Sequence, residues 1–155
     1  MNCFESFRLK IMYWNGWKIV WPVVFAFIFI HIGTVYGIYL IVFSQVSWLT
    51  LIWQNIMHLI SAPGITAGAH RLWSHRSFKA KLPLRLYLAY AQTLSLQRDI
   101  YEWSADHRIH HKYSETDADP HNAKRGFFYS HIGWIMIEKH PEAAKKSELD
   151  YFIFT

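Results

Sequence analysis

The sequence predicts an all-α membrane protein, in which a two-helix transmembrane hairpin is followed by a cytosolic helical region rich in histidine. Residues 19–43 form an uncharged, apolar run of 25 residues, and an α-helix needs only about 20 to cross a bilayer. A second apolar run at 48–67 follows after four residues. Five of the ten histidines then occur in two tight groups beyond these runs.

The first run, IVWPVVFAFIFIHIGTVYGIYLIVF, has the composition of a transmembrane helix. Trp17 and Trp21 lie at its start, where aromatic side chains belong at a membrane interface. Pro22 falls in the predicted first turn, where its missing N–H costs little. A cleaved signal peptide is the alternative interpretation. The run is too long for one and lacks a small-residue cleavage site.

The link at 44–47 is too short for anything but a helical hairpin. Lysines and arginines precede residue 19 and follow residue 70, whereas the link has none. The positive-inside rule therefore places both open ends in the cytosol and the link in the lumen. Residues 1–18 become a cytosolic segment. The net charge of +5 fits a membrane surface better than a nucleic acid, because the basic residues flank apolar segments.

Two further apolar stretches are too short to span. Residues 84–96 are predicted to form a helix that lies in the membrane interface or packs as a buried core helix, and both interpretations stay open. The stretch at 126–137 is similarly short. Together, residues 68–150 are expected to form the cytosolic or interfacial histidine region, followed by an atypical tail at 151–155. The single cysteine, Cys3, excludes an internal disulfide and a cysteine zinc site.

The grouped histidines have the spacing of metal ligands. His107, His110 and His111 share one face of an α-helix, because residues at i, i+3 and i+4 are neighbours. His70 and His75 are five apart and diverge on a regular helix. We expect a break between these two residues that turns both side chains toward one site.

Other polar residues are expected to support the site rather than to bind the metal. His31 and His58 are interpreted as hydrogen-bonded core or tunnel residues, and Asp106 as a partner that orients an imidazole. Imidazole ligands suit Zn, Cu, Fe and Ni alike, but neither group contains the glutamate of a zinc hydrolase. A histidine site beside an apolar membrane chamber favours oxidative chemistry on a lipid. The remaining histidines, expected to be interfacial or to support ligands, are His121, His131 and His140.

Two long motifs resemble the membrane acyl-CoA delta-9 desaturases of animals and insects. They are GITAGAHRLWSHRSFKAKLPLR and IYEWSADHRIHHKYSETDADPHNAKRGFFYSHIGW, and the similarity runs from about residue 18 to 150. The resemblance implies a histidine-ligated di-iron centre that uses dioxygen. Electrons would come from NADH through a reductase and a cytochrome b-type carrier. The product would be a cis double bond in a saturated fatty acyl-CoA, in the endoplasmic reticulum membrane.

The same resemblance implies roles for individual residues. Trp103 and Gln97 match positions that line and bend the acyl tunnel, and Asp106 joins the residues expected at the substrate. His58 and Ala62 match positions near the closed end of the tunnel, where bulk limits chain length. The implied metal ligands are His70, His75, His107, His110 and His111.

The sequence also departs from this family. A third histidine box and the later spans are absent, so we expect a truncated chain that is inactive alone and holds fewer than two irons. Pro63 is unusual and could kink the second span. Four positions that hold the polar CoA head in relatives differ here: Val23, Arg98, Ala105 and Glu138.

Two other functions were weighed against the desaturase. One is a non-catalytic membrane protein, or a partner of an intact desaturase. The other is a related di-iron hydroxylase, which the flanks EWSADH and SETDADPHN argue against.

Overall fold

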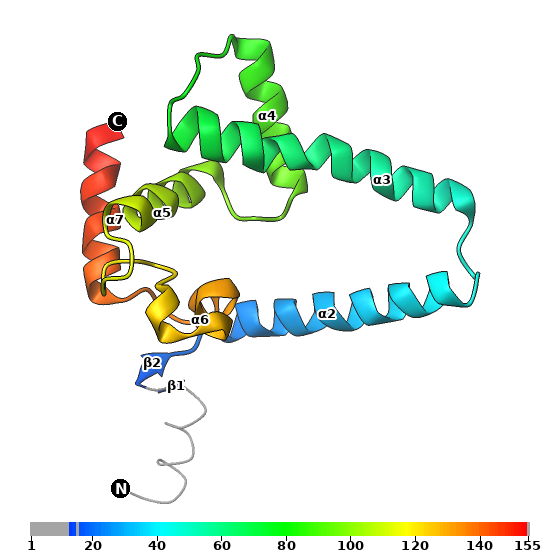
Figure 1. Ribbon diagram of the computed structural model, residues 1–155, viewed down its shortest axis with the longest axis horizontal. Coiled ribbons are helices and arrows are strands. Elements are labelled where there is room, and N and C mark those ends of the chain that lie inside the picture. The colour runs from blue at the N-terminus through cyan, green and yellow to red at the C-terminus, as the bar shows by residue number, and fades with distance from the viewer. Residues whose placement is uncertain (1–12, 15, 155) are drawn as a thin grey trace, which may run out of the picture.

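The computed structural model describes residues 13–14 and 16–154, which are mostly helical (Figure 1). Two short strands, β1 (Tyr13–Trp14) and β2 (Trp17–Lys18), pair antiparallel ahead of the first long helix. The predicted helical character is therefore confirmed. Cys3 and most of the expected cytosolic segment 1–18 lie outside the described residues.

Helix α2 (Trp21–Val42) corresponds to the first apolar run. None of its residues is buried, and among the described residues it is the one helix long and apolar enough to cross a membrane. Its polar side chains bond to its own backbone. His31 Nδ1 lies 2.7 Å from the Phe27 carbonyl oxygen, and the Thr34 hydroxyl donates to Ile30 at 2.8 Å. These internal bonds suit a surface that faces lipid, where no water satisfies polar groups.

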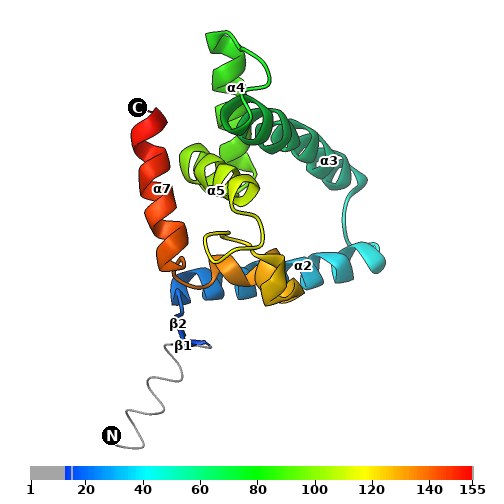
Figure 2. The same cartoon turned by 60° about the vertical axis from the view of Figure 1, so that its left-hand side comes forward.

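The second apolar run folds differently from the expected span at 48–67. Helix α3 (Trp48–Pro63) begins after the Ser47 cap and has 16 residues. Pro63 has no N–H to donate, which interrupts the α-helical bonding. The chain then continues as a π-helix, η1 (Gly64–Ser74). Helices α2 and α3 meet at the 44–47 link and diverge from it, so they do not pack side by side (Figures 1 and 2).

Helix α4 (Leu82–Leu94) crosses the junction of α3 and η1 (Figure 1). Tyr87 donates its hydroxyl to the Ile60 carbonyl of α3 at 3.2 Å. Leu88 and Ala91 are buried on the face toward η1, whereas Leu86 on the opposite side is 61% exposed. The helix is thus buried along one face only, which combines the two interpretations left open by the sequence.

The remaining chain packs around helix α5 (Ile100–Lys112), which contacts η1 on one side and α7 (Pro141–Phe154) on the other. Between α5 and α7 lie three short helices: η2 (Ala123–Arg125), α6 (Phe127–His131) and η3 (Gly133–Ile135). Backbone bonds from Val20 to Met136 and from Glu138 to Lys18 tie this region to the start of α2. Helix α7 continues through residues 151–154 of the expected tail.

The crossing of α4 over η1 depends on Gly64. A Cβ atom at this residue would overlap the backbone of Ala91 and Gln92. Overpacking of this kind costs about 1–3 kcal/mol or more. We therefore expect Gly64→Ala to lower the thermal unfolding midpoint of the chain in detergent, followed by circular dichroism.

Gly37→Ala is the matched control, because a Cβ at Gly37 meets nothing within 4 Å. Alanine favours a helix over glycine by about 1 kcal/mol, so this variant should unfold at the same or a higher temperature. Equal midpoints for the two variants would contradict the close crossing.

Candidate metal centre

The π-helix η1 brings His70 and His75 together. Its backbone bonds run from residue i to i+5, and the His75 N–H donates to the His70 carbonyl at 3.0 Å. Residues five apart therefore follow one another on the same face. The two rings lie 4.5 Å apart between centroids. The convergence expected from the sequence arises from a wider helix rather than from a break.

Two carbonyl groups of η1 also bind side chains of α5. The Ala69 carbonyl accepts the Ser74 hydroxyl at 2.6 Å and the Ser104 hydroxyl of α5 at 3.3 Å. The Trp73 carbonyl accepts the Arg108 guanidinium at 3.1 Å. Ser104 and Arg108 are one turn apart on α5. These bonds hold α5 against η1, so the two histidine groups face each other.

Helix α5 begins with a side-chain cap that fixes its position. The Asp99 carboxylate accepts the Glu102 N–H at 2.9 Å, as expected for an N-cap aspartate. The helix then runs 13 residues and ends beyond the second histidine group. Positively charged side chains near this end would interact favourably with the helix dipole.

Four imidazoles form the first group of possible ligands: His70, His75, His107 and His111. His107 Nε2 lies 3.0 Å from the Nε2 atoms of both His75 and His111. A metal held by imidazoles at about 2.1 Å, with ligands at right angles, separates neighbouring nitrogens by about 3.0 Å. The spacing of these nitrogens therefore fits ligation of one transition metal ion.

The electrostatics of this group favour a neutral ring at His107. Its pKa is lowered to about 3, mainly by burial and then by the neighbouring His111, His70, His75 and His110, in that order. Desolvation, followed by His70 and His111, also lowers the pKa of His75. A neutral imidazole keeps a lone pair for a metal, so no proton has to leave His107 at neutral pH.

His110 points to a different group from the one expected. Its Nδ1 lies 2.9 Å from Asp119 Oδ1, and its ring centroid is 4.2 Å from that of His121. His110, Asp119 and His121 form a second set of possible ligands. Burial is the main cause of the lowered pKa of His121, and His110 adds to it. The two groups adjoin, because the His110 and His111 rings are 5.6 Å apart.

Asp119 is the carboxylate that orients an imidazole. It is buried, with 1% of its surface exposed, and it accepts backbone N–H groups of Glu115 and His121 as well as His110. A carboxylate that accepts from one ring nitrogen fixes the other nitrogen for a metal. Asp119 received no role from the sequence. Its position two residues before His121 was the available signal.

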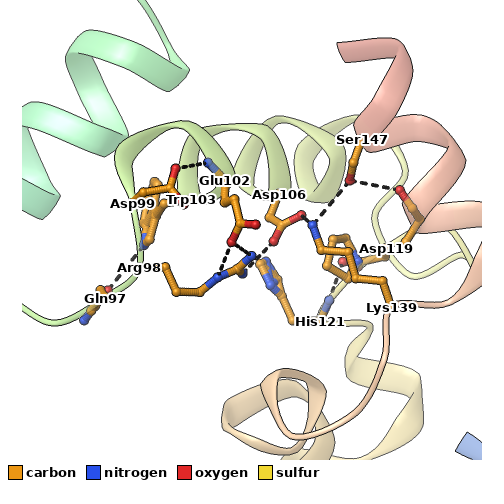
Figure 3. A network of polar contacts seen from close by, with 12 residues as sticks. Gln97, Arg98, Asp99, Glu102, Trp103, Asp106, Asp119, His121, Lys139 and Ser147 are labelled. Atoms are coloured by element: carbon orange, nitrogen blue, oxygen red, sulfur yellow. Dashed lines mark hydrogen bonds and ion pairs between the residues drawn. The ribbon is translucent and has the colours of Figure 1, made fainter. Parts of the chain in front are cut away.

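Asp106, expected to orient an imidazole, instead holds two cations. Its carboxylate oxygens lie 2.8 Å from Arg98 Nη1 and 2.5 Å from Lys139 Nζ (Figure 3). Arg98 also pairs with Glu102, and Lys139 reaches Ser147 of α7. The physical reason is helical geometry, because adjacent residues such as Asp106 and His107 point in different directions.

The expected substrate residues fall in two places. Trp103 stacks on His107 at 4.9 Å between centroids, and its indole N–H donates to the Gln97 side chain at 3.3 Å. His58 and Ala62 lie one turn apart on α3, two to three turns before His70 in the continuous helix. Trp103 and Gln97 therefore border the imidazoles, whereas the other pair lies farther along the apolar helix.

The donor set fits a nitrogen-binding transition metal. It consists of imidazoles with one carboxylate nearby, and imidazole suits Fe, Zn, Cu and Ni. The first group contains no carboxylate ligand, which disfavours Mg²⁺ and Ca²⁺ because both prefer oxygen. The imidazoles could thus hold a metal, and the long apolar helix α2 suggests that the chain is associated with a membrane.

Comparison with known proteins identifies the class as acyl-CoA desaturases. "Stearoyl-CoA desaturase 5" from Bos taurus is 59% identical over 128 residues, which is 83% of this chain and 38% of that protein. "Acyl-CoA desaturase" from Cyprinus carpio is 58% identical over the same shares. "Acyl-CoA Delta-9 desaturase" from Acheta domesticus is 53% identical over 84% of this chain and 36% of its own length.

These matches confirm the resemblance found in the sequence. No family model matches the chain. The chain spans less than two fifths of the length of the curated relatives quoted above. Over most of its own length, this chain therefore matches a part of the acyl-CoA desaturases.

Asp106 should contribute strongly to stability. Asp106→Asn leaves Arg98 and Lys139 without their shared carboxylate, and breaking a buried ion pair costs about 3–5 kcal/mol. We expect the lower end, about 3 kcal/mol, because the two cations stay 26% and 29% exposed. Denaturant unfolding in detergent measures the loss.

Glu138→Gln provides the comparison, because the Lys18–Glu138 pair is about half exposed on both sides. An exposed pair contributes at most about 1 kcal/mol. A loss for Asp106→Asn no larger than that for Glu138→Gln would show that the buried network is not stabilising.

Proposed function

We propose that this chain forms the membrane hairpin and the first two histidine boxes of an acyl-CoA desaturase. The observation that carries the proposal is the four-imidazole group, in which His107 Nε2 is 3.0 Å from two other ring nitrogens. The similarity to acyl-CoA desaturases supports it independently. The reaction would introduce a cis double bond into a saturated fatty acyl-CoA.

Five histidines are the proposed iron ligands of this chain. They are His70, His75, His107, His110 and His111. When bound, the di-iron centre would activate dioxygen and supply the oxidant that breaks an unactivated C–H bond. The protein groups hold neutral imidazoles in place, and Asp119 fixes the ring of His110. Other ligands would be needed to complete two iron sites.

Trp103 and Gln97 are proposed to position the acyl chain beside the metal. Trp103 covers one face of His107 and is held by the Gln97 side chain. A flat aromatic wall there would exclude water and set how close a methylene group comes to the imidazoles. His58 and Ala62 are proposed to lie near the closed end of the acyl tunnel, along α3.

The membrane placement follows from α2 and the distribution of charge. We infer a multi-pass protein of the endoplasmic reticulum, with α2 and the α3–η1 helix as the two spans and the histidines facing the cytosol. The 27 residues from Trp48 to Ser74 are continuously helical, which is long enough to cross a bilayer. Electrons would come from a cytochrome b-type carrier and its NADH-dependent reductase on the cytosolic side.

Two of the four altered CoA-head positions take part in ion pairs within the chain. Arg98 binds Glu102 and Asp106, and Glu138 binds Lys18. The charge of Arg98 is already paired and is less available to a phosphate, whereas the Glu138 carboxylate would repel one. We therefore expect weaker binding of the CoA head than in relatives with arginine at positions 105 and 138.

Iron content gives a direct test of the ligands. We expect the purified chain to bind iron at fewer than two ions per chain, measured by mass spectrometry of the metal. His107→Ala should remove most of this iron, because His107 contacts two other ligand nitrogens. His131→Ala is the control, since His131 is exposed and stacks on Phe127. Equal iron in both variants would contradict the assignment.

A chimera tests the reaction. The matching segment of the Bos taurus desaturase is replaced by residues 18–150 of this chain, and conversion of stearoyl-CoA is measured in membranes. We expect a double bond to form in the chimera and none when His107→Ala is added. A chimera that folds and binds two irons, yet forms no product, would favour the non-catalytic alternative.

A further inference from the structure

The chain carries a run of positively charged residues next to the second apolar helix, with no acidic residue nearby in the sequence. Between residues 19 and 98 the sequence has six lysines and arginines and no aspartate or glutamate. Arg98 is paired with acids of α5. The other five fall within residues 71–85, which we call the basic segment. They are Arg71, Arg76, Lys79, Lys81 and Arg85.

Most of these charges face solvent without an acidic partner. Arg71, Lys79, Lys81 and Arg85 are exposed, and no ion pair involves these four among the residues that the structure describes. The loop folds back on the helix end, because Ser77 donates both its N–H and its hydroxyl to the Arg71 carbonyl. Arg71 therefore stays close to the loop that carries the lysines.

Large apolar side chains alternate with these cations. Leu82, Leu84 and Leu86 are 65%, 44% and 61% exposed, and Tyr90 is 60% exposed. Exposure of such side chains to water is unfavourable in free energy, and contact with lipid chains relieves it. Long basic side chains beside them can extend their charged ends to the head groups. This mixture is typical of a helix that lies in a membrane interface.

The direction of α4 agrees with an interfacial position. Figure 1 shows α4 running across the direction of α2, and it crosses α3 where that helix ends. If α2 spans the bilayer, α4 lies approximately parallel to the membrane plane. The basic segment then lies at the level of the phosphate groups of the leaflet. This position uses α2 as a span and does not depend on metal or acyl-CoA.

We propose that the basic segment, residues 71–85, binds anionic phospholipid head groups of the cytosolic leaflet. Each lysine or arginine near an anionic surface strengthens binding by about fivefold. An acidic protein is the alternative partner. The lipid fits better, because it offers anionic head groups to the cations and hydrocarbon to the exposed leucines between them.

Lipid binding can be measured on the whole purified chain. The chain in detergent is titrated with phosphatidylserine or phosphatidylcholine, and native mass spectrometry counts the bound lipids. We expect a preference for phosphatidylserine of more than tenfold in apparent Kd, which weakens as salt screens the charges. Lys79→Gln, Lys81→Gln and Arg85→Gln, combined, should remove most of this preference. Circular dichroism checks that the variant stays helical.

A matched variant removes three exposed lysines elsewhere: Lys112→Gln, Lys124→Gln and Lys145→Gln. It should keep the preference, as should a variant with Lys79→Arg and Lys81→Arg that conserves charge. Equal affinity for the two lipids in the wild type would overturn the proposal. A preference that survives the basic-segment variant would also overturn it. Charge-dependent binding of polyglutamate without any lipid preference would assign the surface to an acidic protein instead.

Discussion

The backbone bond from His75 to the His70 carbonyl is the constraint on which the candidate site depends. In an α-helix, residues five apart project in different directions, whereas bonding from i to i+5 brings them to the same face. The bond thus brings the two imidazoles together. Near the same end of η1, the carbonyls of Ala69 and Trp73 accept side chains of α5 and dock the second histidine group against the first.

Two buried carboxylates, Asp106 and Asp119, connect α5 to the segments around it. Asp119 gathers His110 and two backbone N–H groups of the following loop, and Asp106 joins Arg98 before α5 to Lys139 before α7. A buried charge is tolerated only when it is paired or hydrogen-bonded. These two aspartates therefore determine where the segments around α5 can lie.

Much of this architecture could be predicted from the sequence, and the failures have physical causes. The apolar run at 19–43 indicated α2 to within two residues, because length and composition alone define such a helix. The same criteria located the second apolar helix at 48–67. They count apolar residues and do not register that the α-helical bonding gives way to π-helical bonding after Pro63. Adjacency in sequence suggested Asp106 as the partner of an imidazole.

The histidine spacing was informative where one regular helix carries the residues. His107 and His111 are one turn apart and share a face, as the i, i+4 rule requires. His110 turns toward the loop at 113–121, where its ring bonds to Asp119. The position of Asp119 depends on how the chain folds, which no local sequence pattern records. The meeting of His70 with His75 was expected, but its cause, a π-helix, leaves no simple signature in composition.

Asp119 also couples the loop at 113–121 to the candidate site. The same carboxylate accepts the N–H groups of Glu115 and His121 and lies 2.9 Å from the His110 ring. A change in the conformation of this loop would therefore displace the His110 imidazole.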